Sequence, residues 1–369
     1  MIPPRTAGRP ALEPTGVAEV RRSTSGRGLV DVMVVIGVVA AALSLTTLLV
    51  TRVIPAANMI GFVAIAYLLF LALYAMVVLS REHDGGAVAD RLASVAMHSL
   101  AVLALLALLF VVGFTFWRGR EALPHLNFFT QDMRLAGSLD PLTVGGILHA
   151  MVGTLLETTI ALLFTVPLGL ACAVYLNEAR GVLPRFVRTV VEAMTALPSI
   201  VVGLFVFASF ILTFGLTRSG LAAGLAIFVM ILPIVIRAAD VVLRLVPGSL
   251  REASFAMGAT KWRTAWHVVL PTVRSGLTTA VLLGTARGVG EVSPVLITAG
   301  VASAVNVDPL TGPMMSLPLV TYLFSQYSEP AMIARAFGAA VVLLALVLVL
   351  FALARVFGGA QRAGAGYVR

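Results

Sequence analysis

Two charged residues stand inside an apolar stretch near the end of the sequence. Arg287 and Glu291 lie within residues 282–300, LLGTARGVGEVSPVLITAG, a run apolar enough to cross a membrane. Their spacing places them on one helix face, where they can pair, and pairing offsets a penalty of about 2.5–3.5 kcal/mol for a charge at the bilayer centre. The guanidinium also offers a fork of donors that fits an oxyanion. Two roles follow: an anion-binding station, or a structural pair that joins two helices.

The neighbouring residues favour the anion-binding role. Gly284, Gly288 and Gly290 are expected to leave open space beside the charges, whereas a packing pair would be surrounded by bulk. Pro294 is expected to break the helix and to release backbone groups near a path. The candidate substrate path therefore starts with Arg287 and Glu291.

Arg237 is a further candidate for this path. It stands three residues before Asp240, and Arg244 stands four after it, near the cytoplasmic end of a run where long cations reach toward the interface. A structural role fits this group better, but Arg237 can also receive an anion at the inner exit.

Transmembrane helices must position these residues. Of the 369 residues 59% are hydrophobic and only 12% are charged, about half the charge content of a soluble domain. Apolar runs of about 20 residues are long enough to span a bilayer as helices, and they are continuous rather than alternating, which argues against a β-barrel. We expect an all-α polytopic bundle, with a kink at Pro198 and Ser199 in the fifth run. The eight runs are 29–50, 54–79, 93–117, 144–176, 188–214, 220–244, 276–299 and 331–355.

The distribution of cations predicts the orientation. With eight spans, the segments on one side hold 18 of the 26 Lys and Arg residues and those on the other side hold 6. Because cations accumulate in cytoplasmic loops, both termini are expected in the cytoplasm. The net charge of +9 is thereby assigned to membrane topology, and no nucleic-acid partner is expected.

Composition also divides the chain into regions. The first two runs carry few polar residues, whereas the later six carry most of the intramembrane charges, so function is expected in the later six. The predicted organisation is a disordered basic cytoplasmic tail (1–28), an accessory hairpin and linker (29–92), a six-span core (93–356) and a cytoplasmic tail (357–369).

The loop between the sixth and seventh runs, residues 246–275, has the pattern of two short helices. Leu250, Ala253 and Met257 recur at helical spacing, Gly258 breaks the helix, and a second helix carries Trp262 and Trp266. Apolar residues on such a loop indicate docking into a partner's groove. The alternative is an amphipathic helix that lies on the lipid surface.

The same loop resembles the EAA loop of ABC importer permeases. The matching residues are Glu252, Ala253, Ser254, Gly258, Val268, Leu270 and Pro271, with Ser254 in place of the usual alanine and Val268 in place of the usual isoleucine. The resemblance implies a type I ABC importer fold. It also implies that Glu252, Ala253, Ser254, Gly258, Leu270 and Pro271 belong to coupling helices that bind a cytosolic ATPase.

Three further stretches are similar to the PstA family of phosphate importer permeases. They are ALPSIVVGLFVF (196–207), LPIVIRAADVVLRLVP (232–247) and ARGVGEVSPVLITAG (286–300), and the resemblance covers residues 93–355. It implies a permease subunit in a bacterial cytoplasmic membrane that imports phosphate by alternating access. Importers of another oxyanion, such as sulfate, molybdate or phosphonate, and a proton-driven secondary transporter are the alternatives.

The resemblance also implies partners. These are a homologous permease (PstC-like), an ATPase dimer (PstB-like), an external phosphate-binding protein (PstS-like) and the lipid bilayer. The sequence contains no glycine-rich phosphate loop followed by Gly-Lys-Ser or Gly-Lys-Thr. We therefore expect a transport subunit that is not itself an enzyme and binds no cofactor, with ATP and Mg²⁺ held by the ATPase.

Overall fold

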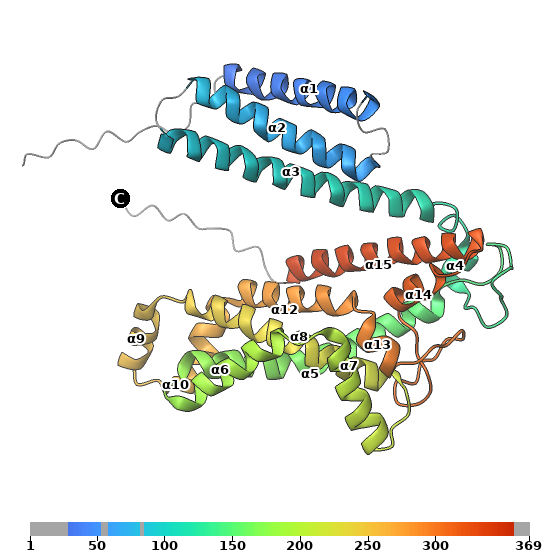
Figure 1. Ribbon diagram of the computed structural model, residues 1–369. Coiled ribbons are helices and arrows are strands. Elements are labelled where there is room, and N and C mark those ends of the chain that lie inside the picture. Colours follow the sequence, from blue (N-terminus) through green and yellow to red (C-terminus); the bar gives the residue numbers. More distant parts are fainter. Residues whose placement is uncertain (1–28, 53–57, 82–84, 358–369) are drawn as a thin grey trace, which may run out of the picture. The chain divides into compact units, whose positions relative to one another are not determined.

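The computed structural model describes residues 29–52, 58–81 and 85–357. Within these ranges every regular element is a helix (Figure 1), which confirms the predicted all-α fold. The predicted tail 1–28, and residues 358–369 of the predicted C-terminal tail, lie outside the described residues. Contacts divide the chain into two compact units, residues 1–108 and 109–369.

The first unit is built on a helical hairpin. It contains α1 (Leu29–Arg52), α2 (Met59–Arg81) and most of α3 (Gly85–Gly119). Val38 of α1 is buried together with Phe70 and Tyr74 of α2, and Tyr67 shares a hydrogen bond of 3.2 Å with Ser99 of α3. The division predicted at residues 92 and 93 falls inside α3, which continues across that point as one helix.

The second unit holds the later helices of the chain. They are α4 (Leu126–Thr130), α5 (Leu148–Glu178), α6 (Val182–Thr195), α7 (Ser199–Val206), the π-helix η1 (Phe207–Thr213), α8 (Gly220–Arg244), α9 (Gly248–Ala256), α10 (Lys261–Thr264), the π-helix η2 (Ala265–Val269), α11 (Leu270–Thr272), α12 (Arg274–Val289), α13 (Ser293–Thr298), α14 (Leu317–Phe324) and α15 (Pro330–Phe357). Helices α9 and α10 lie at one end of this bundle, and α4 and α14 lie at the other (Figure 1).

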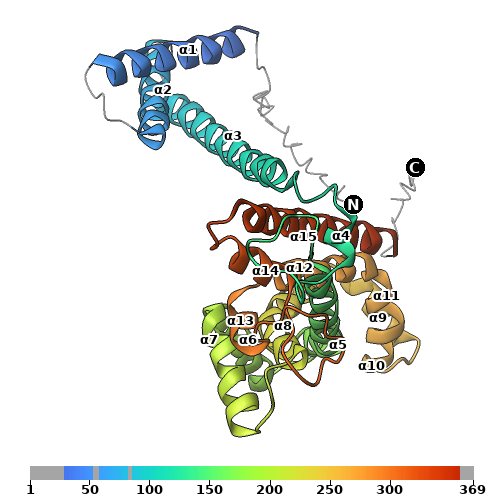
Figure 2. The same cartoon turned by 90° about the vertical axis from the view of Figure 1, so that its right-hand side faces the viewer.

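The helices account for the predicted membrane spans. Six described helices are long and apolar enough to cross a membrane, or up to eight if each of two bent pairs forms one span. The fifth predicted run is one of these pairs: α6 and α7 with η1 meet at 105°. α7 packs against α13 and α8, and its continuation η1 projects from the bundle (Figures 1 and 2). Pro198 immediately precedes α7, which confirms the predicted kink.

Small residues bring the central helices together. α5 and α8 pack along much of their length, and a Cβ added to Gly224 would lie 2.6 Å from Cγ2 of Ile160. Ala161 and Ala223, on the two helices, are fully buried in the same core. Within a membrane, close approach of this kind provides most of the attraction between helices. α8 is thus the central support against which the candidate site is placed.

Candidate functional site

The intramembrane pair forms as its spacing predicts. Nη2 of Arg287 lies 3.3 Å from Oε1 of Glu291, and the side chains are 59% and 14% exposed. α12 ends at Val289, so Glu291 lies in the irregular segment between α12 and α13. The carboxylate is therefore held by the fold, while the guanidinium is largely open to its surroundings.

The prediction of open space beside this pair is wrong for two of the three glycines. A Cβ added to Gly284 would lie 2.5 Å from Cγ2 of Val235, and one added to Gly288 would lie 2.8 Å from Cγ2 of Ile227. Both contacts are to α8, so these glycines allow α12 to pack closely against α8. Of the three glycines, only Gly290 could carry a Cβ with no neighbouring heavy atom nearer than 3.8 Å.

The helix break near the pair has a packing partner. Pro294 stands in the first turn of α13, and the backbone is irregular at residues 290–292, which confirms the expected interruption. Gly203 of α7 rests against it: a Cβ at this glycine would lie 2.7 Å from Cα of Pro294. The broken segment is thus fixed by α7.

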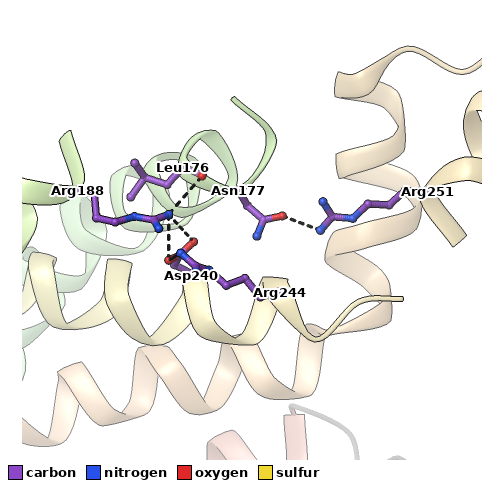
Figure 3. A network of polar contacts seen from close by, with 6 residues as sticks. All are labelled: Leu176, Asn177, Arg188, Asp240, Arg244 and Arg251. Carbon is purple, nitrogen blue, oxygen red and sulfur yellow. Dashed lines mark hydrogen bonds and ion pairs between the residues drawn. The ribbon is translucent and has the colours of Figure 1, made fainter. Parts of the chain in front are cut away.

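The structure does not join Arg237 to the pair on α12. Arg237 is exposed on α8, and its Nη1 donates to Oγ1 of Thr195 on α6 at 3.2 Å. Its predicted neighbour Asp240 is instead the centre of a network with two other arginines (Figure 3). Arg244 donates to Oδ2 of Asp240 at 2.7 Å, and Nη2 of Arg188 lies 3.4 Å from the same oxygen.

The loop between α8 and α12 contains the two predicted short helices. α9 ends at Ala256, and Gly258 has a φ of +83°. Nothing lies within 4 Å of a Cβ added there, so glycine is required by the backbone conformation and not by space. The chain then continues through α10, η2 and α11, where Leu270 is half-buried and Pro271 is exposed.

The two halves of this loop are joined by a buried hydrogen bond. Oγ of Ser254 and Oγ1 of Thr264 lie 2.9 Å apart, and the Ser254 carbonyl accepts from the Ala259 N–H at 3.1 Å. Glu252 and Ala253 are exposed. The serine that replaces the usual alanine therefore holds α9 to α10, a role beyond allowing close approach.

Apolar side chains cover the outside of the loop. Met257 is 88% exposed and Trp262 is 63% exposed. The Trp262 and Trp266 rings meet edge-on with centroids 5.9 Å apart. The loop therefore offers an exposed apolar surface at one end of the bundle.

Sequence reasoning missed Arg335, which closes the opposite end of the bundle. It is fully buried on α15, and its Nη2 donates to the carbonyls of Pro141 at 2.7 Å, Val144 at 2.8 Å and Asp140 at 3.2 Å. In the predicted orientation it counts only as one of the 6 cations on the non-cytoplasmic side. Its position at the start of an apolar run was the available signal, but its acceptors are backbone atoms almost 200 residues away.

Loops at this same end are linked through Asp132. Its carboxylate accepts the Val305 N–H at 3.0 Å and the Arg134 N–H at 3.1 Å, and the Met133 N–H donates to the Ser303 carbonyl at 2.9 Å. Burial alone would raise the pKa of Asp132, but the hydrogen bonds, together with the charges of His149 and Arg134, lower it below its ordinary value. The loops 131–147 and 299–316 are thus tied together.

Comparison with known proteins gives the class and then the nearer relatives. Residues 165–362 match the family described as "Binding-protein-dependent transport system inner membrane component", and the chain belongs to this family of multi-pass inner membrane permeases, which are not enzymes. Over 247 residues it is 40% identical to the phosphate transport system permease protein PstA 1 of Mycobacterium tuberculosis, covering 67% of this chain and 81% of that protein.

Two further similarities were found. The phosphate transport system permease protein PstA of Pasteurella multocida is 34% identical over 215 residues, covering 58% of this chain and 76% of that protein. A chain of the MetNI methionine ABC transporter in an inward-facing conformation superposes with a TM-score of 0.46 at 21% identity, covering 58% of this chain and 93% of that chain.

Proposed function

We propose that the chain is the transmembrane permease subunit of an ATP-driven importer of inorganic phosphate. The observation that carries the proposal is its 40% identity to a phosphate transport system permease over four fifths of that protein's length. The two short helices around Gly258 support it, because they present an exposed apolar surface on which an ATPase can dock. A secondary transporter, which is driven by an ion gradient, does not need such a surface.

The proposed assembly follows from the two ends of the second unit. The exposed surface of α9 and α10 faces the cytoplasm and docks on a PstB-like ATPase dimer, which binds ATP and Mg²⁺. The end closed by Arg335 faces outward, toward a PstS-like phosphate-binding protein. A PstC-like permease completes the path, and both termini of this chain are cytoplasmic.

Arg287 is the proposed phosphate contact on this path. Its side chain lies on an exposed stripe of α12 with Thr279 and Leu283, where it can face the second permease. A phosphate group can accept two parallel hydrogen bonds from the guanidinium. When the anion leaves, Glu291 takes its place as the partner. This exchange keeps binding weak enough for release during alternating access.

The test is ATP-dependent uptake of labelled phosphate by proteoliposomes that contain the assembled complex. Arg287→Gln is expected to lower uptake about tenfold or more, the factor for losing one hydrogen bond to a charged group. Arg185→Gln is the control, because Arg185 is an exposed cation on α6, outside both α12 and the docking loop. Unchanged uptake in the Arg287 variant would make that residue structural.

The same vesicles test the substrate and the energy source. Competition by sulfate, molybdate or a phosphonate that exceeds competition by phosphate would identify a different oxyanion. Uptake that continues without ATP, and stops when a proton ionophore is added, would replace the ABC mechanism with a secondary transporter.

A further inference from the structure

Arg251 connects the loop to the ends of two long helices. Its guanidinium reaches from α9 toward the last turns of α5 and α8 (Figure 3). Nη2 donates to Oδ1 of Asn177 at 2.6 Å and to the Leu243 carbonyl at 3.2 Å. Nη1 forms an ion pair of 3.0 Å with Glu178. One side chain thus holds three groups on two helices.

The surroundings make this contact stronger than an ordinary surface pair. The side chains of Arg251 and Glu178 are only 19% and 18% exposed, so solvent screens them less than an exposed pair. The Leu243 carbonyl belongs to the last turn of α8, where it accepts from the Val246 N–H at 3.4 Å and so receives a second, charged donor from Arg251. A cation at the C-terminal ends of α5 and α8 is also favoured by their dipoles.

The helices that Arg251 holds already form one body. α5 and α8 are the central packed pair, and Asp240 braces α8 against α6 through Arg188 at the same end. α8 in turn fits closely against Gly284 of α12, the helix that carries Arg287. A continuous series of contacts therefore runs from α9 to the proposed phosphate contact.

The loop has a second connection to α12 that does not use Arg251. The Ser254–Thr264 hydrogen bond joins α9 to α10, and the chain continues through η2 and α11 directly into α12. Without Arg251, displacement of the loop would still pull α12 through the backbone. The loop itself, however, would lose its direct side-chain link to α5.

We propose that Arg251 is a positioning residue that transmits displacement of the loop to α5, so that α5 moves together with α8 and α12, the two helices that the backbone joins to the ends of the loop. The inference rests on the proposed function, because it assumes that an ATPase displaces the loop. It assigns to Arg251 a role separate from docking, since its guanidinium is directed into the bundle while Glu252 and Ala253 are exposed.

The test separates transmission from docking. Complexes with Arg251→Gln and Arg251→Lys are compared with wild type for bound ATPase, rate of ATP hydrolysis and phosphate taken up per ATP hydrolysed. Arg251→Gln is expected to keep the ATPase and its hydrolysis within about twofold, while uptake per ATP falls about tenfold, as expected for one lost hydrogen bond to a charged group. Arg251→Lys keeps the charge opposite Glu178 and is expected to be intermediate.

Arg185→Gln is the matched control, since Arg185 is an exposed cation on α6, and it should behave as wild type. Uptake per ATP at the wild-type level in Arg251→Gln would overturn the inference, as would loss of the ATPase from that complex. If Arg251→Gln does not fold, Asn177→Ala removes one acceptor and is judged by the same ratio. A wild-type complex that holds no ATPase or moves no phosphate would instead overturn the proposed function.

Discussion

Two arginines from apolar runs, Arg287 and Arg335, have opposite surroundings. The side chain of Arg287 is 59% exposed and pairs with one carboxylate at 3.3 Å. Arg335 is fully buried, and one of its nitrogens donates to three backbone carbonyls. The same residue type at the same kind of position therefore has two different environments.

The difference lies in what could replace each arginine's partner. The carbonyls of Pro141 and Val144 are backbone acceptors that meet a fully buried guanidinium, so an incoming ligand cannot take their place beside it. Glu291 is a single side chain beside an exposed guanidinium, and an anion can compete with it for the same donors. Exposure together with a displaceable partner is thus the better sign of a binding role than intramembrane charge alone.

Replacing Arg335 should give the largest loss of stability. Arg335→Met leaves the carbonyls near residues 140–144 without their donor, and we expect the free energy of unfolding to fall by about 3 kcal/mol. Thermal unfolding in detergent measures this, with Arg287→Gln as the comparison, for which we expect a change of about 0.5 kcal/mol or less. Equal losses of unfolding free energy in the two variants would show that Arg287 and Arg335 contribute to stability alike, which contradicts the difference drawn between them.

A smaller effect should follow from moving α12 without touching Arg287. In Gly284→Ala the new methyl group would meet Val235, which is buried and β-branched and so cannot easily turn aside. We expect a loss of about 1 kcal/mol in unfolding free energy, together with reduced phosphate uptake. Gly290→Ala is the control, because nothing lies nearer than 3.8 Å there. Unimpaired uptake in Gly284→Ala would show that the placement of Arg287 is not critical.

The smallest effect should come from Asp132, which ties loops at the same end as Arg335. Because its folded pKa is lowered, its carboxylate stabilises the protein above its unfolded pKa of about 4. That stability is lost as pH falls through the lowered folded value. The difference in unfolding midpoint between wild type and Asp132→Asn should therefore be smaller at acidic pH than at neutral pH. If the difference in unfolding midpoint does not change with pH, the negative charge of Asp132 does not contribute to the contact between the loops.

Local rules predicted much of the fold. The apolar runs gave the helices because their length and continuity match a bilayer. Gly258 and Pro198 marked two breaks because their backbone preferences act within one turn. The pair of Arg287 and Glu291 was predicted from the spacing of residues on one helix face, and it forms although Glu291 lies two residues beyond the end of α12.

Contacts between distant segments could not be read in the same way. Asp240 lies three residues from Arg237 in the sequence, but its partners are Arg244 of the same helix and Arg188 of α6. The glycines of α12 were interpreted as space because nothing in the sequence indicates that Val235 and Ile227 fill it. Arg251 and Asn177 are 74 residues apart, and their meeting depends on how α5 and α8 pack.

Gly258 has a consequence for chirality. Its backbone is left-handed, yet the space where a side chain would point is empty. An L-alanine would be strained there by its configuration alone, whereas a positive φ is the conformation that a D-alanine prefers, and a D-alanine would also reduce the freedom of the unfolded chain. The backbone conformation of the turn, and not the space around it, therefore excludes L-residues with a side chain. Glycine is tolerated because it is the achiral encoded amino acid.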